Sequence, residues 1–228
     1  MAKEIEKEVA HYYDLYPTEE DLMGETSDHA DLVHYLRDVL TWLFYGLACA
    51  VYENLNFYQT DYYREQPLAP ELAVIKGVNF RRMRSWRVGK SGPAPQVVFE
   101  IVSKETWKKD LKEKPVRYAH MGVQEYFVYD PNDPLILREP AHRLHGWQLD
   151  PVTQQMREIP LRPDGSLWSI QLQSLLVPDG AYLRLYDQYR QLCLTKAEAE
   201  ERRAEMAEKR AQILAEKLRS LGIDPDQL

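Results

Sequence analysis

The stretch QVVFEIVS at residues 96–103 decides the fold, together with EYFVYDP at residues 125–131. Both are short apolar runs rich in Val, Phe and Tyr, which is typical of buried strands. The residues between them carry a helical pattern, and Asp130-Pro131 ends the second run. Strands joined through a helix predict a crossover connection. We therefore expect an α/β domain with a mixed sheet.

The chain on the N-terminal side of this unit adds a helix and further strands. A helix is predicted from about residue 28 to 47, capped by Ser27 or Asp28. Residues 49–61 have a strand-like pattern, and an apolar run follows at 72–78. Residues 1–27 are expected to form an acidic arm before the main domain, residues 28–190. The helix is expected to bury apolar residues at three- and four-residue spacing: Val33, Leu36, Leu40, Leu43 and Leu47.

On the C-terminal side, we expect a peripheral antiparallel extension and then a long helix. The helix spans residues 195–221, with Thr195 and Glu198 as a capping box and Gly222 as its stop. Its apolar positions recur in heptad steps, interrupted by Glu200. The helix therefore either pairs with a second copy as a coiled coil, or docks on its own domain or remains exposed to solvent. The extension is predicted from four runs: 135–137, 144–149, 168–172 and 182–186.

Composition places the chain among globular proteins. It has 228 residues, 44% of them hydrophobic, and a net charge of −7, which suits one domain with an appendage. The longest uncharged stretch, residues 39–52, is shorter than the roughly 18–20 residues that a membrane span needs. The charged N-terminus lacks the apolar core of a secretory signal, and two cysteines make no disulfide framework. We expect a cytoplasmic protein without a membrane partner.

The charge is unevenly distributed along the chain. Residues 76–117 carry twelve basic and four acidic side chains, although the whole chain is acidic. Such a segment suits a phosphate backbone, and a solvated basic loop is the equal alternative. Phe80 and Trp86 lie in this segment and either stack on bases or pack locally.

Several familiar chemistries are excluded by spacing. Gly89-Lys90-Ser91 resembles the end of a phosphate-binding loop, but Arg84 stands where that loop needs a glycine. The chain has no G-x-S-x-G elbow and no H-x-x-x-H pair. We therefore expect neither a nucleotide cofactor nor zinc.

Two carboxylates and a lysine remain as candidates. Glu71 starts an apolar run, and Glu100 lies inside one, where a carboxylate is costly unless it is paired or holds a cation. Glu100 could instead pair with Lys104 or Arg117, and Glu71 could simply be exposed.

The segment around Pro115 also indicates a site. Pro115 predicts that the helix restarts there, with Lys112 and Lys114 near its N-terminus. Lysines at this end oppose the helix dipole, so an anion such as phosphate would explain them; a solvated lysine is the alternative.

At these residues the sequence resembles the bacterial putative restriction endonuclease domain family of the PD-(D/E)XK nuclease superfamily. The resemblance rests on PQVVFEIVSKET at residues 95–106 and KDLKEKPVRYAHMGVQEYFVYDP at residues 109–131, and extends to residues 16–29, 69–74 and 221–226. It implies a restriction-endonuclease-like core, in which helices flank the mixed central sheet. It also implies a metal-dependent DNA endonuclease, and we expect a homodimer.

The resemblance assigns roles to individual residues. It places Glu71 at the family's Pro-Asp aspartate and Glu100 at the acid of the (D/E)XK motif. Both acids would hold Mg²⁺, or Mn²⁺, with the carbonyl of Ile101. Val102 occupies the nominal lysine position, and the displaced family lysine corresponds to Lys114.

Other positions match the family outside this central set. Glu25 matches a further acid, and His29 a recurrent histidine. The residues expected to bind DNA are Arg81, Arg82, Arg84, Arg87, Lys90 and Lys112.

Two departures keep a second function open. Glu71 is one methylene longer than the family's aspartate, and Gln96 replaces the aspartate usual before the Glu100 strand. They favour a catalytically inactive nuclease fold that binds nucleic acid or a protein partner. A third possibility is a scaffold that acts only through the C-terminal helix.

Overall fold

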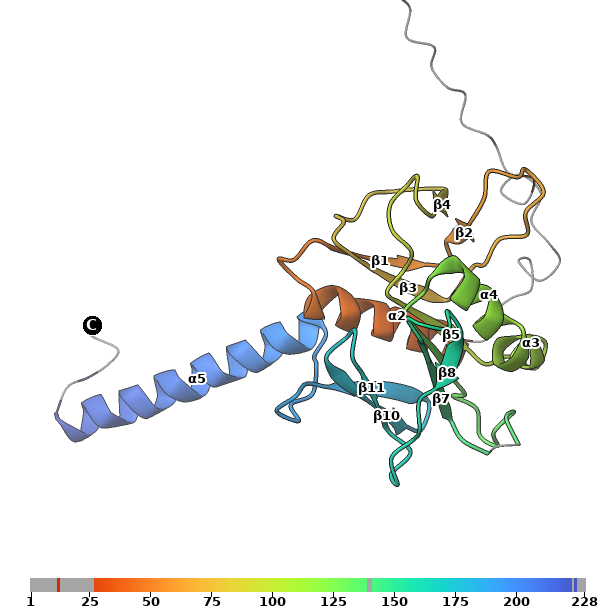
Figure 1. Ribbon diagram of the computed structural model, residues 1–228. Helices are drawn as coiled ribbons and strands as arrows, with labels where there is room; N and C mark the ends of the chain where they lie inside the picture. The colour runs from red at the N-terminus through yellow and green to blue at the C-terminus, as the bar shows by residue number, and fades with distance from the viewer. Residues whose placement is uncertain (1–11, 13–26, 139–140, 223, 225–228) are drawn as a thin grey trace, which may run out of the picture. The chain divides into compact units, whose positions relative to one another are not determined.

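The computed structural model describes residues 12, 27–138, 141–222 and 224, and within them a mixed sheet forms the centre of the fold (Figure 1). Its strands follow the order β1-β3-β5-β6-β7-β8. β5 and β6 are parallel, as the helical crossover predicts, and the other neighbours are antiparallel. The predicted α/β class with a mixed sheet is confirmed. The strand bounds are β1 Cys49–Glu53, β3 Leu72–Lys76, β5 Val97–Ile101, β6 Glu125–Tyr129, β7 Leu144–Leu149 and β8 Met156–Glu158.

Helices cover both faces of this sheet. α2, Ser27–Leu43, packs its apolar stripe on one face, where Phe99 and Val74 belong to the same cluster as Leu36. α3, Trp107–Lys112, and α4, Lys114–Met121, lie on the other face, with Val98 and Tyr118 in its cluster. Because side chains alternate along a strand, β5 contributes to both cores, and all five of its residues are buried.

Two smaller sheets complete the main unit. β9, Leu167–Ser169, β10, Ser174–Asp179, and β11, Tyr182–Tyr186, form an antiparallel sheet whose leucines pack in the α2 cluster. β2, Asn56–Tyr58, runs parallel to β4, Ser85–Arg87, beside the basic segment. The predicted antiparallel extension is therefore present as the β9–β11 sheet.

Three predicted elements differ from the structure. α2 ends at Leu43 rather than residue 47, because Gly46 takes a positive φ of 81° and Leu47 is 65% exposed. Residues 144–149 form β7 inside the central sheet, where we expected a peripheral strand. Residues 135–137 form no strand, because the Asp130 carboxylate accepts the backbone N–H groups of residues 136 and 137, at 2.7 and 2.8 Å.

The chain separates into two compact units, with the boundary between Cys193 and Leu194. The second contains α5, Lys196–Ser220, which begins with the predicted capping box: Thr195 Oγ1 accepts from Glu198 N–H, and the Glu198 carboxylate accepts from Thr195 N–H. No residue of α5 is buried. None of the described helices combines the length and apolarity needed to cross a membrane. The predicted acidic arm, residues 1–27, lies almost wholly outside the described residues.

Candidate active site

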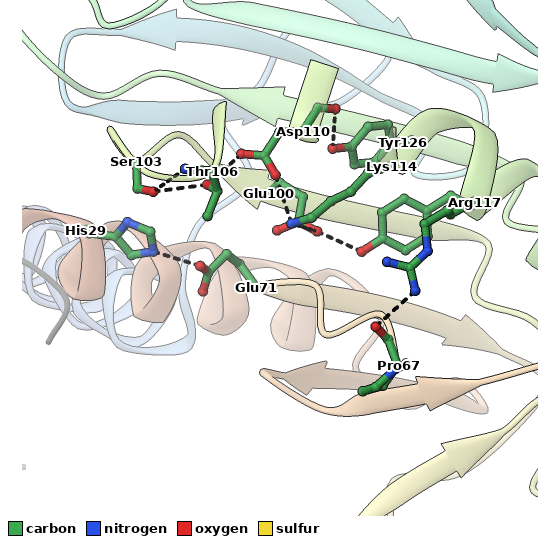
Figure 2. A network of polar contacts seen from close by, with 11 residues as sticks. His29, Pro67, Glu71, Glu100, Ser103, Thr106, Asp110, Lys114, Arg117 and Tyr126 are labelled. Atoms are coloured by element: carbon green, nitrogen blue, oxygen red, sulfur yellow. Dashed lines mark hydrogen bonds and ion pairs between the residues drawn. The ribbon is translucent and has the colours of Figure 1, made fainter. Parts of the chain in front are cut away.

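Strand register brings the two predicted acids together. β3 pairs antiparallel with β5, and Leu72 lies opposite Phe99. One step further along this register places Glu71 opposite Glu100. Figure 2 shows the two side chains in one cluster, and the charge of Glu71 contributes to raising the pKa of Glu100. Two residues far apart in sequence are therefore neighbours at one end of the sheet.

Lys114 joins this pair from the first turn of α4. Its Nζ lies 2.8 Å from Glu100 Oε1 and 2.8 Å from Asp110 Oδ1. Pro115 stands in the first turn of the helix, as predicted, and sets the direction in which α4 leaves. Burial disfavours the charged ammonium, but the two carboxylates outweigh it, so the pKa of Lys114 is raised and the group stays protonated.

Glu100 is held in an apolar strand by polar partners on α4. It is 4% exposed, and Tyr118 donates its hydroxyl hydrogen to Glu100 Oε1 at 2.7 Å. Burial raises the pKa of Glu100 to about 7, with Lys114 opposing the shift and Asp110 adding to it. The predicted alternative partners are not used: Lys104 is exposed, and Arg117 donates to the carbonyls of residues 66 and 67.

Asp110 is a site residue that our sequence analysis missed. It is 1% exposed, its carboxylate accepts a hydrogen bond from the Thr106 hydroxyl at 2.7 Å, and its other oxygen pairs with the Lys114 ammonium. Tyr126 donates to its backbone carbonyl at 2.8 Å. The signal was the spacing: Asp110 and Lys114 are four residues apart, the separation at which opposite charges pair along a helical segment.

The two carboxylate oxygens of Glu71 have different surroundings. His29, in the first turns of α2, places Nε2 3.0 Å from Glu71 Oε1. Glu71 Oε2 is buried and has no hydrogen-bond partner among the described residues. A buried carboxylate oxygen without a partner is costly, and together with Glu100 it offers the oxygen ligands that Mg²⁺ and Mn²⁺ prefer. These residues therefore fit such an ion.

The described residues contain no group of three His, Cys, Asp or Glu side chains arranged for a metal ion. A site here would draw on the two carboxylates, backbone oxygen and water, as Mg²⁺ often does. The predicted further acid, Glu25, lies outside the described residues.

The departure at Gln96 lies away from the acids. Gln96 precedes β5, four residues before Glu100, which is roughly 13 Å along a strand. Its side-chain oxygen accepts the Lys76 N–H at 2.5 Å, so it fastens the C-terminal end of β3. Its substitution for aspartate therefore leaves the carboxylate pair itself unchanged.

The predicted DNA-binding residues separate into two groups. Arg82, Arg84, Lys90 and Lys112 are exposed. Arg81 is exposed too, but its guanidinium donates to the Ser91 carbonyl at 2.8 Å. Arg87 differs from expectation: it is 5% exposed, on the buried side of β4, with Nη1 4.0 Å from Asp61 Oδ1. A side chain so enclosed offers little surface to a phosphate.

The chain matches the model of a known protein family. The model of the Uma2 family, described as "Putative restriction endonuclease", matches residues 20–173, which are 154 of the 228. The chain belongs to the Uma2 family. The Uma2 match includes all four predicted catalytic residues: Glu25, Glu71, Glu100 and Lys114.

No curated protein matches the chain. Among solved structures, the chain is similar to a crystal structure described as a "putative nuclease belonging to DUF820" from Anabaena variabilis. The identity is 13% and the TM-score 0.45, over 66% of this chain and 76% of that one.

Proposed function

We propose that this Uma2 protein is a metal-dependent DNA endonuclease that hydrolyses phosphodiester bonds. The observation that carries the proposal is the cluster that Glu71 and Glu100 form at one end of β3 and β5 (Figure 2), with Lys114 Nζ at 2.8 Å from Glu100 Oε1. Two carboxylates beside a protonated lysine offer a cation site next to a positive hydrogen-bond donor. That combination suits the charge that develops during attack on a phosphate.

Glu71, through its unpartnered Oε2, and Glu100 would hold Mg²⁺ or Mn²⁺. When bound, such an ion polarises the phosphate and acidifies a water molecule. The carbonyl of Ile101 is proposed as a further oxygen ligand, and Glu25 as a further acid beside the ion, because the family resemblance implies them.

The other residues position these groups. Lys114 is partly exposed, at 19% of its side chain, so its ammonium can reach a bound phosphate or orient the attacking water. Asp110 and Glu100 fix the lysine from two sides. His29 fixes Glu71, and Tyr118 fixes Glu100.

DNA would be held through its phosphates by exposed basic side chains, those of Arg82, Arg84, Lys90 and Lys112. Among the described residues, none of these four has an ion pair that would compete with a phosphate. Replacing Arg82 and Arg84 with alanine should weaken DNA binding and flatten its salt dependence by roughly one unit of slope per lost contact. An unchanged slope in a binding titration would remove both arginines from the interface.

A plasmid cleavage assay tests the activity. Supercoiled DNA is incubated with the wild-type protein and Mg²⁺ or Mn²⁺, beside Glu100→Ala, Lys114→Ala and the exposed control Lys104→Ala. We expect metal-dependent nicking by the wild type and the control, and loss of nicking in the other two variants. Nicking that persists in Glu100→Ala would point to a contaminating nuclease or to another site.

A catalytically inactive DNA-binding module is the second candidate. It is favoured by the closed ion-pair network, in which Lys114 already neutralises charge on both Glu100 and Asp110. It predicts no heat of Mg²⁺ or Mn²⁺ binding by calorimetry, whereas the endonuclease proposal predicts binding that Glu100→Ala abolishes.

We further propose that α5 pairs with a second copy of the chain as a parallel coiled coil. If Ala204 and Leu218 occupy the first core position of each heptad, Lys196 and Arg203 flank the seam on one side. They then face Glu201 and Glu208 of a parallel partner, whereas an antiparallel partner would place like charges together. The seam comprises Ala197, Ala204, Ala207, Ala211, Leu214, Leu218 and Leu221.

Charge reversal tests this dimer. Lys196→Glu with Arg203→Glu, or Glu201→Lys with Glu208→Lys, should each weaken the homodimer in sedimentation experiments, and an equimolar mixture should restore a dimer. Failure of the mixture to dimerise would exclude the parallel register.

The two free cysteines also fit a reducing compartment, and we propose that the protein acts in the cytoplasm.

A further inference from the structure

One aromatic side chain of the basic segment lies at the surface. We name residues 77–92, which connect β3 to β5 by way of β4, the arginine loop. Phe80 in this loop is 61% exposed, whereas Trp86 is 1% exposed. Of the two aromatic residues, Trp86 therefore packs locally, and Phe80 is available to a ligand.

The ring of Phe80 is supported from behind. It lies against Tyr52, with 5.2 Å between ring centroids, and Tyr52 lies 5.7 Å from Trp86 in the same measure. Trp86 donates Nε1–H to the Pro93 carbonyl at 3.0 Å. Gly92 admits the indole closely, since a Cβ there would stand 2.5 Å from the ring. Phe80 is thus the outer end of an aromatic stack that is rooted in the core.

The backbone beside Phe80 is fastened to the same stack. The Tyr52 hydroxyl donates to the Arg81 carbonyl at 3.1 Å, and Arg81 in turn reaches the Ser91 carbonyl across the loop. Arg81 therefore closes the loop, while Arg82 and Arg84 remain exposed near the ring in sequence. A held aromatic ring beside free guanidinium groups is the combination that single-stranded nucleic acid binders use.

Strand register places this stack close to the carboxylates. Tyr52 lies opposite Ala73, and Glu71 is two residues before Ala73, immediately before β3 begins. Diagonal neighbours of this kind are about 7–8 Å apart at Cα. Phe80 packs on Tyr52, so a nucleotide stacked on Phe80 would lie within a few nucleotides of a phosphate at Glu71 and Glu100.

We propose that Phe80 stacks on an unpaired DNA base, so that the preferred substrate contains a single-stranded or unpaired region next to the cut. A base inside a duplex already has both faces stacked, and a protein ring can reach only a base that is free or extruded. This inference rests on the proposed endonuclease function, because that function makes DNA the ligand. It adds the structural class of DNA.

Binding is measured by fluorescence anisotropy in EDTA, where no cleavage occurs. The probes are a labelled single strand of about 20 nucleotides, the matching blunt duplex and an abasic single strand with the same phosphates. Phe80→Ala should bind the single strand about 5- to 150-fold more weakly, since a stacked base contributes about 1–3 kcal/mol. The duplex and the abasic strand should change little, the salt slope should stay the same, and Phe80→Trp should restore binding.

Two comparisons make the result specific. Tyr189→Ala removes an aromatic ring that is 75% exposed elsewhere and should leave all three affinities unchanged. Arg82→Ala with Arg84→Ala should weaken all three probes and flatten the salt slope. Thermal unfolding of Phe80→Ala, whose ring is mostly exposed, should match that of the wild type.

The outcomes separate this inference from the proposed function. Equal affinity of wild type and Phe80→Ala for the single strand, or an equal loss on the abasic strand, overturns the stacking role even if the protein cleaves DNA. A Phe80-dependent preference for the single strand supports it even if no cleavage is found. Absence of DNA binding by the wild type overturns both.

Discussion

Replacing Lys114 with methionine should make the stability of the protein depend on pH in a new range. Methionine keeps the length of the side chain but removes the charge between Glu100 and Asp110, which are 4% and 1% exposed. With Lys114 present, the pKa of Glu100 is about 7 in the folded state against about 4.5 when unfolded. Without the ammonium, which opposes the effect of burial, the folded pKa rises further.

The sign of the effect follows from proton binding. Between the unfolded and folded pKa values the folded state holds the extra proton, so stability decreases as the pH rises. In the wild type this decrease ends near pH 7. In Lys114→Met it continues to higher pH, at about 1.4 kcal/mol for each pH unit. The difference in the free energy of unfolding between the wild type and Lys114→Met should therefore widen by about 2 kcal/mol from pH 7 to about pH 8.5.

Urea unfolding followed by tryptophan fluorescence in EDTA measures this gap. Lys112→Met, at an exposed position of the neighbouring turn, is the matched control and should follow the wild type at every pH. A gap between Lys114→Met and the wild type that stays constant from pH 6 to about pH 8.5 would refute the reasoning, because Glu100 would then not be coupled to Lys114.

Three further predictions concern other residues. Asp110→Asn should lower the cleavage rate about 10- to 100-fold while calorimetric Mg²⁺ affinity stays within a few fold, since Asp110 positions Lys114 rather than the ion; a larger loss of affinity would contradict this role. Gly146→Ala should destabilise the fold by about 1–3 kcal/mol in urea, because a Cβ there would meet Leu167 and the Phe127 ring within 3 Å; unchanged stability would show that the site relaxes. Burial lowers the pKa of His145, so stability should fall as the pH drops below about 6.5, where only the unfolded histidine gains a proton. His145→Phe should reduce that decline, and an unaltered profile would assign it to other groups.

The sequence predicted the centre of the fold because its signals are local. Residues 97–101 and 125–129 are continuous apolar runs, and Glu100 stands out in one of them because a buried carboxylate is costly. The restart of the helix at Pro115 is likewise a local steric effect. Local patterns could therefore identify Glu100 and Lys114 as candidates, and the structure brings their charged atoms together.

Other features depend on contacts between distant residues. The neighbourhood of Glu71 and Glu100 follows from the register of β3 against β5, which no single segment encodes. Arg87 was expected at the surface because it lies in a basic run, yet β4 turns it inward. Asp110 lies between lysines in the sequence, so the pattern did not single it out. Its role follows only from the structure, in which Lys114 contacts both Asp110 and Glu100.

The connection from β3 to β5 leaves the sheet and returns to the neighbouring strand. Glu71 and Glu100 are placed by backbone hydrogen bonds between these strands, whereas the arginine loop forms an excursion between them. Insertions or exchanges in such an excursion add little closure entropy and need not shift the strands that anchor it. The proposed chemistry and the proposed choice of DNA are thus carried by separate parts of this architecture, so that exchange of one loop would alter the ligand while the carboxylates stay in place.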